Sequence, residues 1–228
     1  MTKWNTLIES HTTEFDKLDT LDKRLAFGTV TSMLDNLLEK NLTVLDFGCG
    51  AGRFEKTLTD AREGLRVFGY DPAPVAIALA KKGQYQIDCT FENKLIDRQY
   101  DVALVNFVLC TMPDISATVK TISKVLKPGG KIIISEPHPD GMGYHFCSYH
   151  PEKPQSFVDG AEYTTHLSGM EPFIDYWHPK SAYRNALHIA NFEGIVFTEV
   201  LAFSNSVEWR DERIQAPYLH ICAEKVQK

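Results

Sequence analysis

Three glycines at alternate positions follow an acidic residue in the stretch 42–54, Leu-Thr-Val-Leu-Asp-Phe-Gly-Cys-Gly-Ala-Gly-Arg-Phe. Glycine adopts positive φ freely and lets a ligand lie against bare peptide, so Gly48, Gly50 and Gly52 predict a turn at a binding site. Asp46 stands two residues before the first glycine. Its carboxylate would repel a pyrophosphate but attract a ligand that carries an ammonium and a sulfonium group. The spacing therefore predicts a site for a cationic nucleoside.

A second carboxylate follows the glycines about twenty residues later. The run 65–71 reads as a strand that ends at Asp71, where such a unit presents a carboxylate to a ribose diol. Each charge-assisted hydrogen bond to the ribose would contribute ~1.5–3 kcal/mol. Asp71 followed by Pro72 would also suit the start of a helix over 73–82, so a capping role stays open beside the binding role.

Histidines and aromatic residues are concentrated between residues 137 and 178, and a connection of this length is usually a lid or binding loop. Histidine is suited to removing a proton from a hydroxyl or thiol at neutral pH. His138 and His178 are the candidate bases, because the chain order places both at the ligand edge of the predicted sheet. The alternative for each is a hydrogen-bonded structural histidine. Candidates for orienting an acceptor are Tyr144, Tyr176 and Arg184.

Apolar runs and helical patterns alternate along most of the chain, which predicts an α/β fold with a doubly wound, mostly parallel sheet. The expected strands are 42–47, 65–71, 85–91, 100–106, 131–136, 195–203 and 217–223. The expected helices are 20–39, 53–63, 73–82, 114–125 and 179–190. Right-handed crossovers bring the carboxyl ends of parallel strands to one edge, so Asp46, Asp71 and Asn106 are expected to lie together.

The chain of 228 residues suits a single domain. Within it we expect four parts, which are an N-terminal helical cover, a cofactor-binding core, a lid and acceptor insertion, and a C-terminal helix with a strand pair. They span residues 1–40, 42–136, 137–178 and 179–228. A flap formed by residues 1–20 is the alternative to a simple covering helix.

The composition favours a cytoplasmic chain that does not enter a membrane. Five cysteines, an odd number without a Cys-x-x-Cys pair, indicate a reducing compartment and argue against structural zinc. No apolar run approaches the ~20 residues of a membrane span, and the N-terminus lacks a signal-peptide core. A net charge of −6 disfavours nucleic acid as a partner. Glu136-Pro-His138-Pro-Asp140 carries metal-ligand residue types, but its prolines splay the ligands, and we expect no metal.

Val44 to Gly52 closely resembles motif I of the class I S-adenosylmethionine-dependent methyltransferases. Asp71 resembles motif II, and Leu126-Lys-Pro-Gly-Gly130 followed by a strand resembles a third hallmark. The resemblance covers residues 42–136, with the motifs in the family's order. A dinucleotide fingerprint would place its third glycine at position 53, which is Arg53, so a nicotinamide oxidoreductase is disfavoured.

This resemblance implies a seven-stranded Rossmann-like methyltransferase fold with a lid insertion after strand five, and an antiparallel last strand. It implies S-adenosylmethionine as cofactor and S-adenosylhomocysteine as product. The end of the third strand would meet the adenine, and the end of the fourth would line the methionine moiety. The implied cofactor-binding residues are Asp46, Phe47, Gly48, Gly50, Asp71, Pro72, Glu92, Asn93, Asn106 and Phe107.

The sequence thus predicts methyl transfer by in-line displacement to a small-molecule acceptor, with a histidine as base, in a monomer or homodimer. Holding the acceptor in line with the methyl group can supply ~7–11 kcal/mol. Two alternatives stay open. One is a tRNA- or protein-modifying methyltransferase, which the acidic charge and the absence of an Asn-Pro-Pro-Tyr motif disfavour. The other is a non-catalytic S-adenosylmethionine-binding protein.

Overall fold

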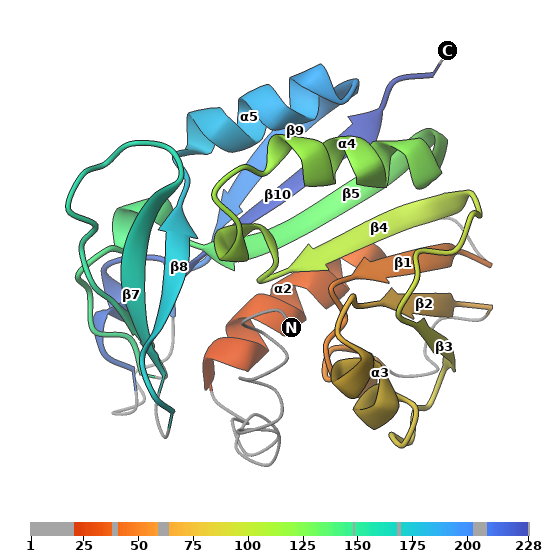
Figure 1. Ribbon diagram of the computed structural model, residues 1–228, viewed down its shortest axis with the longest axis horizontal. Helices are drawn as coiled ribbons and strands as arrows, with labels where there is room; N and C mark the ends of the chain where they lie inside the picture. Colours follow the sequence, from red (N-terminus) through yellow and green to blue (C-terminus); the bar gives the residue numbers. More distant parts are fainter. Residues whose placement is uncertain are drawn as a thin grey trace.

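Seven strands form one sheet in the order β3-β2-β1-β4-β5-β10-β9 (Figure 1). The computed structural model describes residues 21–37, 41–58, 64–147, 149–167, 170–202 and 209–227. Strands β1 to β5 are parallel, and β10 pairs antiparallel with both β5 and β9, which confirms the predicted doubly wound sheet. The strands are β1 Thr43–Phe47, β2 Arg66–Tyr70, β3 Asp88–Glu92, β4 Tyr100–Asn106, β5 Leu126–Pro137, β9 Phe192–Glu199 and β10 Tyr218–Lys225.

Helices cover both faces of this sheet, with α2 and α3 on one side and α4 and α5 on the other (Figure 1). They are α2 Leu21–Asp35, α3 Pro74–Ala80, α4 Ser116–Val125 and α5 Lys180–Ile189. In α2 the fully buried Ala26, Val30 and Leu34 recur at four-residue spacing, so they form one stripe along the helix. Val30 and Leu34 of this stripe pack on one face of the sheet, which includes Leu104. Helices α4 and α5 pack on the opposite face.

The lid contains a second, antiparallel sheet in the order β6-β7-β8. Its strands are β6 Tyr149–Pro151, β7 Ala161–Leu167 and β8 Phe173–Trp177. Figure 1 places β7 and β8 beyond the ends at which β4 and β5 finish. The lid therefore stands at the carboxyl edge of the main sheet, where the predicted site residues lie.

The helix predicted for 53–63 is wrong over the part that the structure describes. A turn leads into a short 3₁₀ helix, η1 Glu55–Thr57, and Leu58 is already extended with φ −78° and ψ 133°. The Thr57 hydroxyl donates to the Phe54 carbonyl at 2.6 Å. Such local hydrogen bonds from threonine compete with a regular helix, which explains the tight turn. Residues 59–63 lie outside the described residues.

Further strand boundaries differ from the prediction, and β3 begins at Asp88 where the sequence suggested residue 85. The strand expected at 195–203 runs instead from Phe192 to Glu199, because Asn191 adopts φ 63° and turns the chain directly after α5. Residues 126–130, which resemble the family's Leu-Lys-Pro-Gly-Gly hallmark, belong to β5. The register between β4 and β5 shifts there, because Tyr100 pairs with Leu126 but Val102 pairs with Lys131.

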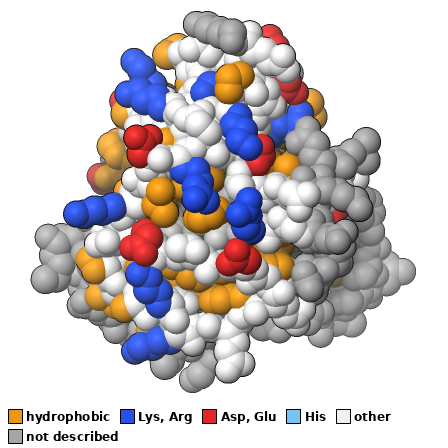
Figure 2. Space-filling view, turned by 90° about the vertical axis from the view of Figure 1, so that its right-hand side faces the viewer, with side chains coloured by type: hydrophobic (Ala, Val, Ile, Leu, Met, Phe, Trp, Pro, Cys, Tyr) orange, Lys and Arg blue, Asp and Glu red, His pale blue; other side chains and the backbone are white. Residues whose placement is uncertain are grey.

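The flap considered for residues 1–20 lies outside the described residues. In the part of the chain that is described, no helix combines the length and apolarity needed to cross a membrane. Figure 2 shows the face turned to the right of Figure 1, where Lys and Arg side chains are interspersed with Asp and Glu.

Candidate functional site

The glycine turn after β1 has the predicted backbone, with φ +83° at Gly48, +55° at Gly50 and +75° at Gly52. The three glycines meet different surroundings. A Cβ on Gly48 would lie 2.3 Å from Val108, and one on Gly52 would lie 2.2 Å from the Tyr85 hydroxyl. A Cβ on Gly50 would meet nothing within 4 Å. The first and third glycines therefore allow close packing, and the middle one borders open space in which a ligand can lie against the peptide.

A pair of buried carboxyl groups lies beneath this turn. Asp46 at the end of β1 is 2% exposed and Glu55 in η1 is fully buried. The pKa of Asp46 is raised to about 7, chiefly by burial. The side-chain interaction with Glu55 lowers this pKa, and the negative charge of Asp71 raises it further. Burial and the Asp46 charge also raise the pKa of Glu55 well above its usual value. Neither Asp46 Oδ1 nor the Glu55 oxygens have a hydrogen-bond donor among the described residues, so a cationic ligand is a suitable partner for the pair.

Glu55 was missed as a site residue by the sequence interpretation, which expected only a regular helix over 53–63. The available signal was an acidic residue three positions beyond the last glycine, in reach of the acid before the first. The side chain is fully buried within the short 3₁₀ helix.

Asp71 at the end of β2 holds the glycine turn in place. Its Oδ2 accepts the Gly50 N–H at 3.0 Å, and its Oδ1 accepts the Ala73 N–H at 2.8 Å. Burial raises the pKa of Asp71, while these two backbone donors oppose the rise. The second bond supports the start of α3, as the capping alternative predicted. Each carboxylate oxygen retains a further lone pair for a ribose hydroxyl, so the two roles are compatible. Pro72 beside it is exposed.

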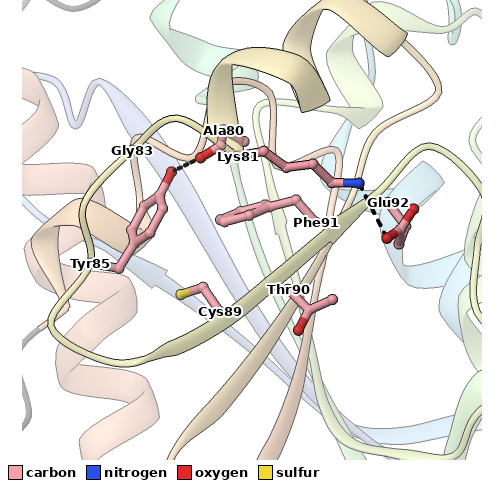
Figure 3. A pocket seen from close by; sticks show the side chains of 8 residues that line it. All are labelled: Ala80, Lys81, Gly83, Tyr85, Cys89, Thr90, Phe91 and Glu92. Atoms are coloured by element: carbon pink, nitrogen blue, oxygen red, sulfur yellow. Dashed lines mark hydrogen bonds and ion pairs between the residues drawn. The ribbon is translucent and has the colours of Figure 1, made fainter.

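The end of β3 places Glu92 one strand further out. Its carboxylate accepts from Lys81 at 3.2 Å, and both side chains line a hollow of about 310 Å³ beside the edge strand (Figure 3). The Glu92 carbonyl accepts the Asp71 N–H at 3.3 Å, which ties this strand end to the ribose-side carboxylate. Asn93 is exposed. The structure therefore places Glu92 next to the glycine-turn site and leaves Asn93 at its outer margin.

The loop after β4 is held by a buried carboxylate. Glu136 on β5 is fully buried and accepts the N–H groups of Val108, Leu109 and Cys110 at 3.0, 2.7 and 3.1 Å. Phe107 adopts φ +56° at the start of this loop, a conformation that costs energy in a residue other than glycine. The three hydrogen bonds to Glu136 fix the loop in that conformation. Glu136 is a second residue that the sequence interpretation missed as a positioning group.

The remaining predicted cofactor residues divide between the two faces of the sheet. Asn106 and Phe107 lie toward α2, where the Phe107 ring contacts Phe27 and Tyr218 with centroids 6.4 and 5.2 Å apart. The Phe47 ring packs on Tyr70 at 4.9 Å and joins the cluster on the α4 and α5 side. Phe47 therefore offers the site its backbone and not its ring.

His138, at the end of β5, is 1% exposed and hydrogen-bonded. Its Nδ1 accepts the Asp140 N–H at 3.1 Å and lies 3.1 Å from the Gln215 amide nitrogen. Its Nε2 lies 3.4 Å from the Glu199 carboxylate. Burial lowers the pKa of His138, and Glu199 opposes this. The accepting nitrogen of the neutral ring is thus occupied by groups of the chain itself.

His178, just before α5, joins the lid to the loop after β4. Its Nδ1 lies 2.6 Å from the Asp159 carboxylate, and its Nε2 lies 2.8 Å from the Met112 carbonyl. Both ring nitrogens therefore face protein oxygens, as in a structural histidine. Arg184, considered for acceptor binding, packs over Phe197 at 4.9 Å on the α5 side, away from the face that carries Asn106.

Among the described residues, there is no group of three or more His, Cys, Asp or Glu side chains that could hold a metal ion. The polar groups of the site are instead carboxyls, the backbone amides of the glycine turn and the side-chain amide of Asn106 at the end of β4. This set fits a nucleoside that carries positive charge, since buried carboxyls face the turn and Gly50 leaves space for it.

Comparison with known proteins agrees with this geometry. A family model described as a methyltransferase domain matches residues 19–197. A ubiquinone biosynthesis O-methyltransferase of Bradyrhizobium sp. (strain ORS 278) is 38% identical over 101 residues, which are 41% of this chain and 39% of that protein. The chain spans less than half of the length of the first curated relatives it matches, at 39%, 48% and 46%.

Solved structures share the fold at lower identity. A putative S-adenosylmethionine-dependent methyltransferase from Listeria monocytogenes is 23% identical with a TM-score of 0.64, covering 86% of this chain and 96% of that one. The structure of DhpI in complex with SAH is 15% identical with a TM-score of 0.62, covering 98% and 96%. These likenesses show that the sheet and its helices follow the arrangement predicted from the sequence.

Proposed function

Since the chain belongs to the methyltransferase domain family, we propose that it transfers the methyl group of S-adenosylmethionine to a small-molecule acceptor. The observation that carries this proposal is the turn at Gly50, which borders open space. It lies near the buried carboxyl of Asp46 and beside the carboxyl of Asp71, which accepts the Gly50 N–H. A ligand with an ammonium and a sulfonium group suits these acids, whereas a diphosphate does not.

Each predicted cofactor residue has a proposed role in this arrangement. Asp46 attracts the cationic end, the peptides of Phe47, Gly48 and Gly50 support the methionine moiety, and Asp71 with Pro72 receives the ribose. Glu92 or Asn93 meets the adenine amino group, and Asn106 and Phe107 line the methionine moiety. When bound, S-adenosylmethionine supplies an activated methyl on sulfur, so the chain has to hold, orient and deprotonate the acceptor.

A small molecule is the proposed acceptor because the lid sheet and an aromatic cluster close the carboxyl edge of the main sheet. The relatives named as ubiquinone biosynthesis O-methyltransferases also favour oxygen as the methylated atom. Of the bases proposed from the sequence, His178 has both ring nitrogens hydrogen-bonded by the chain. His138 has Nδ1 hydrogen-bonded and Nε2 3.4 Å from the Glu199 carboxylate. We therefore assign them a positioning role at the lid.

Isothermal titration with S-adenosylhomocysteine tests the proposed cofactor site, with a nicotinamide dinucleotide as the comparison ligand. We expect S-adenosylhomocysteine to bind in the micromolar range and the dinucleotide to show no heat of binding. Absence of S-adenosylhomocysteine binding at high micromolar concentration would remove the assignment. Binding without methyl transfer to any small molecule would favour the non-catalytic alternative.

A matched pair of glycine variants makes this test specific. Gly50 and Gly194 both have positive φ, +55° and +62°, and a Cβ on either would meet nothing within 4 Å. An alanine therefore brings similar backbone strain at both positions, but only Gly50→Ala places a methyl group in the proposed ligand space. We expect Gly50→Ala to weaken S-adenosylhomocysteine binding at least tenfold and Gly194→Ala to leave it unchanged. Equal effects of the two variants would contradict the placement of the ligand.

A further inference from the structure

Three polar side chains form a row across the centre of the main sheet at its carboxyl edge. Asn106 on β4 pairs with Ser135 on β5, and Ser135 pairs with His220 on β10. Residues in register point to the same face, and neighbouring strands lie about 4.8 Å apart, so the row is about 10 Å long. It lies on the face of Leu104 and Ile133, which pack with α2.

This row contains buried polar atoms that are left without partners. Both amide atoms of Asn106, the Ser135 hydroxyl and Nδ1 of His220 are buried and make no hydrogen bond among the described residues. Ser135 is fully buried and His220 is 1% exposed. A buried polar atom without a partner costs about 1–3 kcal/mol, so several in one row indicate a place prepared for a ligand.

An aromatic cluster covers the row on the side of the lid. Tyr218 lies two residues before His220 on β10 and so points to the same face. Its ring stacks on Tyr149 at 5.6 Å and meets Phe107 edge-on at 5.2 Å. The cluster as a whole draws on α2, the loop after β4, the lid and β10, through Leu25, Ala26, Phe27, Phe107, Tyr144, Phe146, Tyr149, Leu167 and Tyr218. Such rings offer a flat apolar molecule a surface on which to pack, with its polar group toward the row.

His220 differs from His178, whose two ring nitrogens both face protein oxygens, and from His138, whose unbonded Nε2 lies 3.4 Å from the Glu199 carboxylate. Burial lowers the pKa of His220 to about 4, and the nearby His138 contributes to the shift. The ring is therefore neutral at physiological pH and has a lone pair to accept a proton. The facing positions on β5 and β9 hold Ser135 and Thr198, which carry no charge.

The charges around His220 come from the lid side. His138 is bordered by Glu199 and Asp140, and Lys180 pairs with both of these acids. From Leu25 to Leu34, α2 holds no titratable side chain, and the aromatic cluster adds only the phenols of its tyrosines.

We propose that Asn106, Ser135 and His220 form the floor of the acceptor site, that the acceptor is a flat apolar molecule with a phenolic hydroxyl, and that His220 is its base. This inference rests on the proposed methyl transfer. The oxygen lone pair of the hydroxyl forms the new bond to the methyl carbon, which makes the O–H strongly acidic, and in the same step the proton passes to Nδ1 of His220. The electrons of the broken carbon–sulfur bond stay on sulfur, which becomes a neutral thioether. The imidazolium of His220 then releases its proton to solvent.

The test compares wild type with His220→Gln, using S-adenosylmethionine with catechol and 2-naphthol as probes and mass detection of the methyl ethers. Glutamine keeps the size and polarity of the side chain but does not accept a proton. We expect kcat to fall about 100-fold or more, as for loss of a general base, with S-adenosylhomocysteine affinity unchanged within about threefold, a change below 1 kcal/mol. His188→Gln, on the exposed side of α5, is the matched control and should behave as wild type.

The pH profile separates a base from a structural residue. In wild type the rate should be level at neutral pH and fall only in acid, since His220 has to be neutral. In His220→Gln the rate should rise with pH toward the ionisation of the phenol near pKa ~10. A His220→Gln enzyme with wild-type turnover and the wild-type profile would overturn the role of His220.

Ser135→Ala provides a second variant should His220→Gln fail to fold. Its small change should raise the KM for 2-naphthol several-fold while kcat changes little, and an unchanged KM would overturn the proposed floor. Failure to methylate either phenol, in a protein that binds S-adenosylhomocysteine and methylates an amine or thiol, would overturn the phenolic acceptor. Failure to bind S-adenosylhomocysteine at all would instead refute the underlying function.

Discussion

At the residue scale, Asp71 combines a structural and a binding role on one carboxylate. Its two oxygens accept the N–H groups of Gly50 and Ala73, which joins the glycine turn to the start of α3. The carboxylate is thereby held rigidly where a ribose diol is proposed to bind. Preorganisation of this kind improves affinity, because little side-chain freedom is lost on binding.

We expect Asp71→Ala to weaken S-adenosylhomocysteine binding by about one to two powers of ten, since each charge-assisted hydrogen bond contributes ~1.5–3 kcal/mol. Isothermal titration measures the effect. Asp71→Asn retains one accepting oxygen, so its affinity for S-adenosylhomocysteine should lie between those of wild type and Asp71→Ala. An Asp71→Ala protein with wild-type affinity would remove this residue from the ribose role.

At the scale of elements, the site depends on how the ends of β4 and β5 hold the loop between Asn106 and Cys110. Glu136 accepts three successive backbone N–H groups of that loop in a fully buried position. The same strand end leads into His138 and the lid. One carboxylate thus joins the loop after β4, which is proposed to line the methionine moiety, to the strand end that leads into the lid.

Replacement of Glu136 by alanine would leave three backbone donors without their acceptor. We expect Glu136→Ala to lower the free energy of unfolding by about 3–5 kcal/mol, the usual cost of breaking a buried charged network. Urea denaturation measures this. Glu224→Ala breaks the partly exposed pair with Lys131 and should cost under about 1 kcal/mol. Similar values for both variants would show that Glu136 does not hold the loop.

At the scale of the whole molecule, buried titratable groups make stability depend on pH in opposite directions. The pKa of Asp46 is raised from 3.8 to about 7, so the folded state retains a proton that the unfolded state has lost. Its contribution therefore falls as pH rises from about 4 to about 7. The pKa of His220 is lowered from 6.5 to about 4, so its contribution rises with pH over most of the same window. The two effects partly cancel in the wild type.

Asp46→Asn should expose this balance. Relative to wild type, we expect its free energy of unfolding to rise by roughly 1.4 kcal/mol for each pH unit between about pH 4 and pH 7. Chemical denaturation at pH 4.5, 5.5, 6.5 and 7.5 gives the difference. Asp97→Asn, at an exposed position, should show a flat difference. A flat difference for Asp46→Asn as well would mean that its carboxyl is not protonated in the fold.

Much of the fold could be predicted because the signals are local. The apolar run of β4 matches its predicted bounds Tyr100–Asn106, and the glycines took the positive φ that their spacing indicated. Boundaries failed where a single contact decided them. The Thr57 hydroxyl ends η1, and the left-handed Asn191 starts β9 early.

The sequence by itself determined the alternation of strands and helices, the glycine turn and the acids at strand ends, because each depends on near neighbours in the chain. Only the tertiary structure decided which histidine nitrogens lack a hydrogen-bond partner and which carboxyl holds the loop after β4. It also decided that Asn106, Ser135 and His220 share one row. Hydrogen-bond occupancy depends on every group packed around a side chain. The register of β4, β5 and β10 follows from a sheet order that joins residues more than a hundred positions apart.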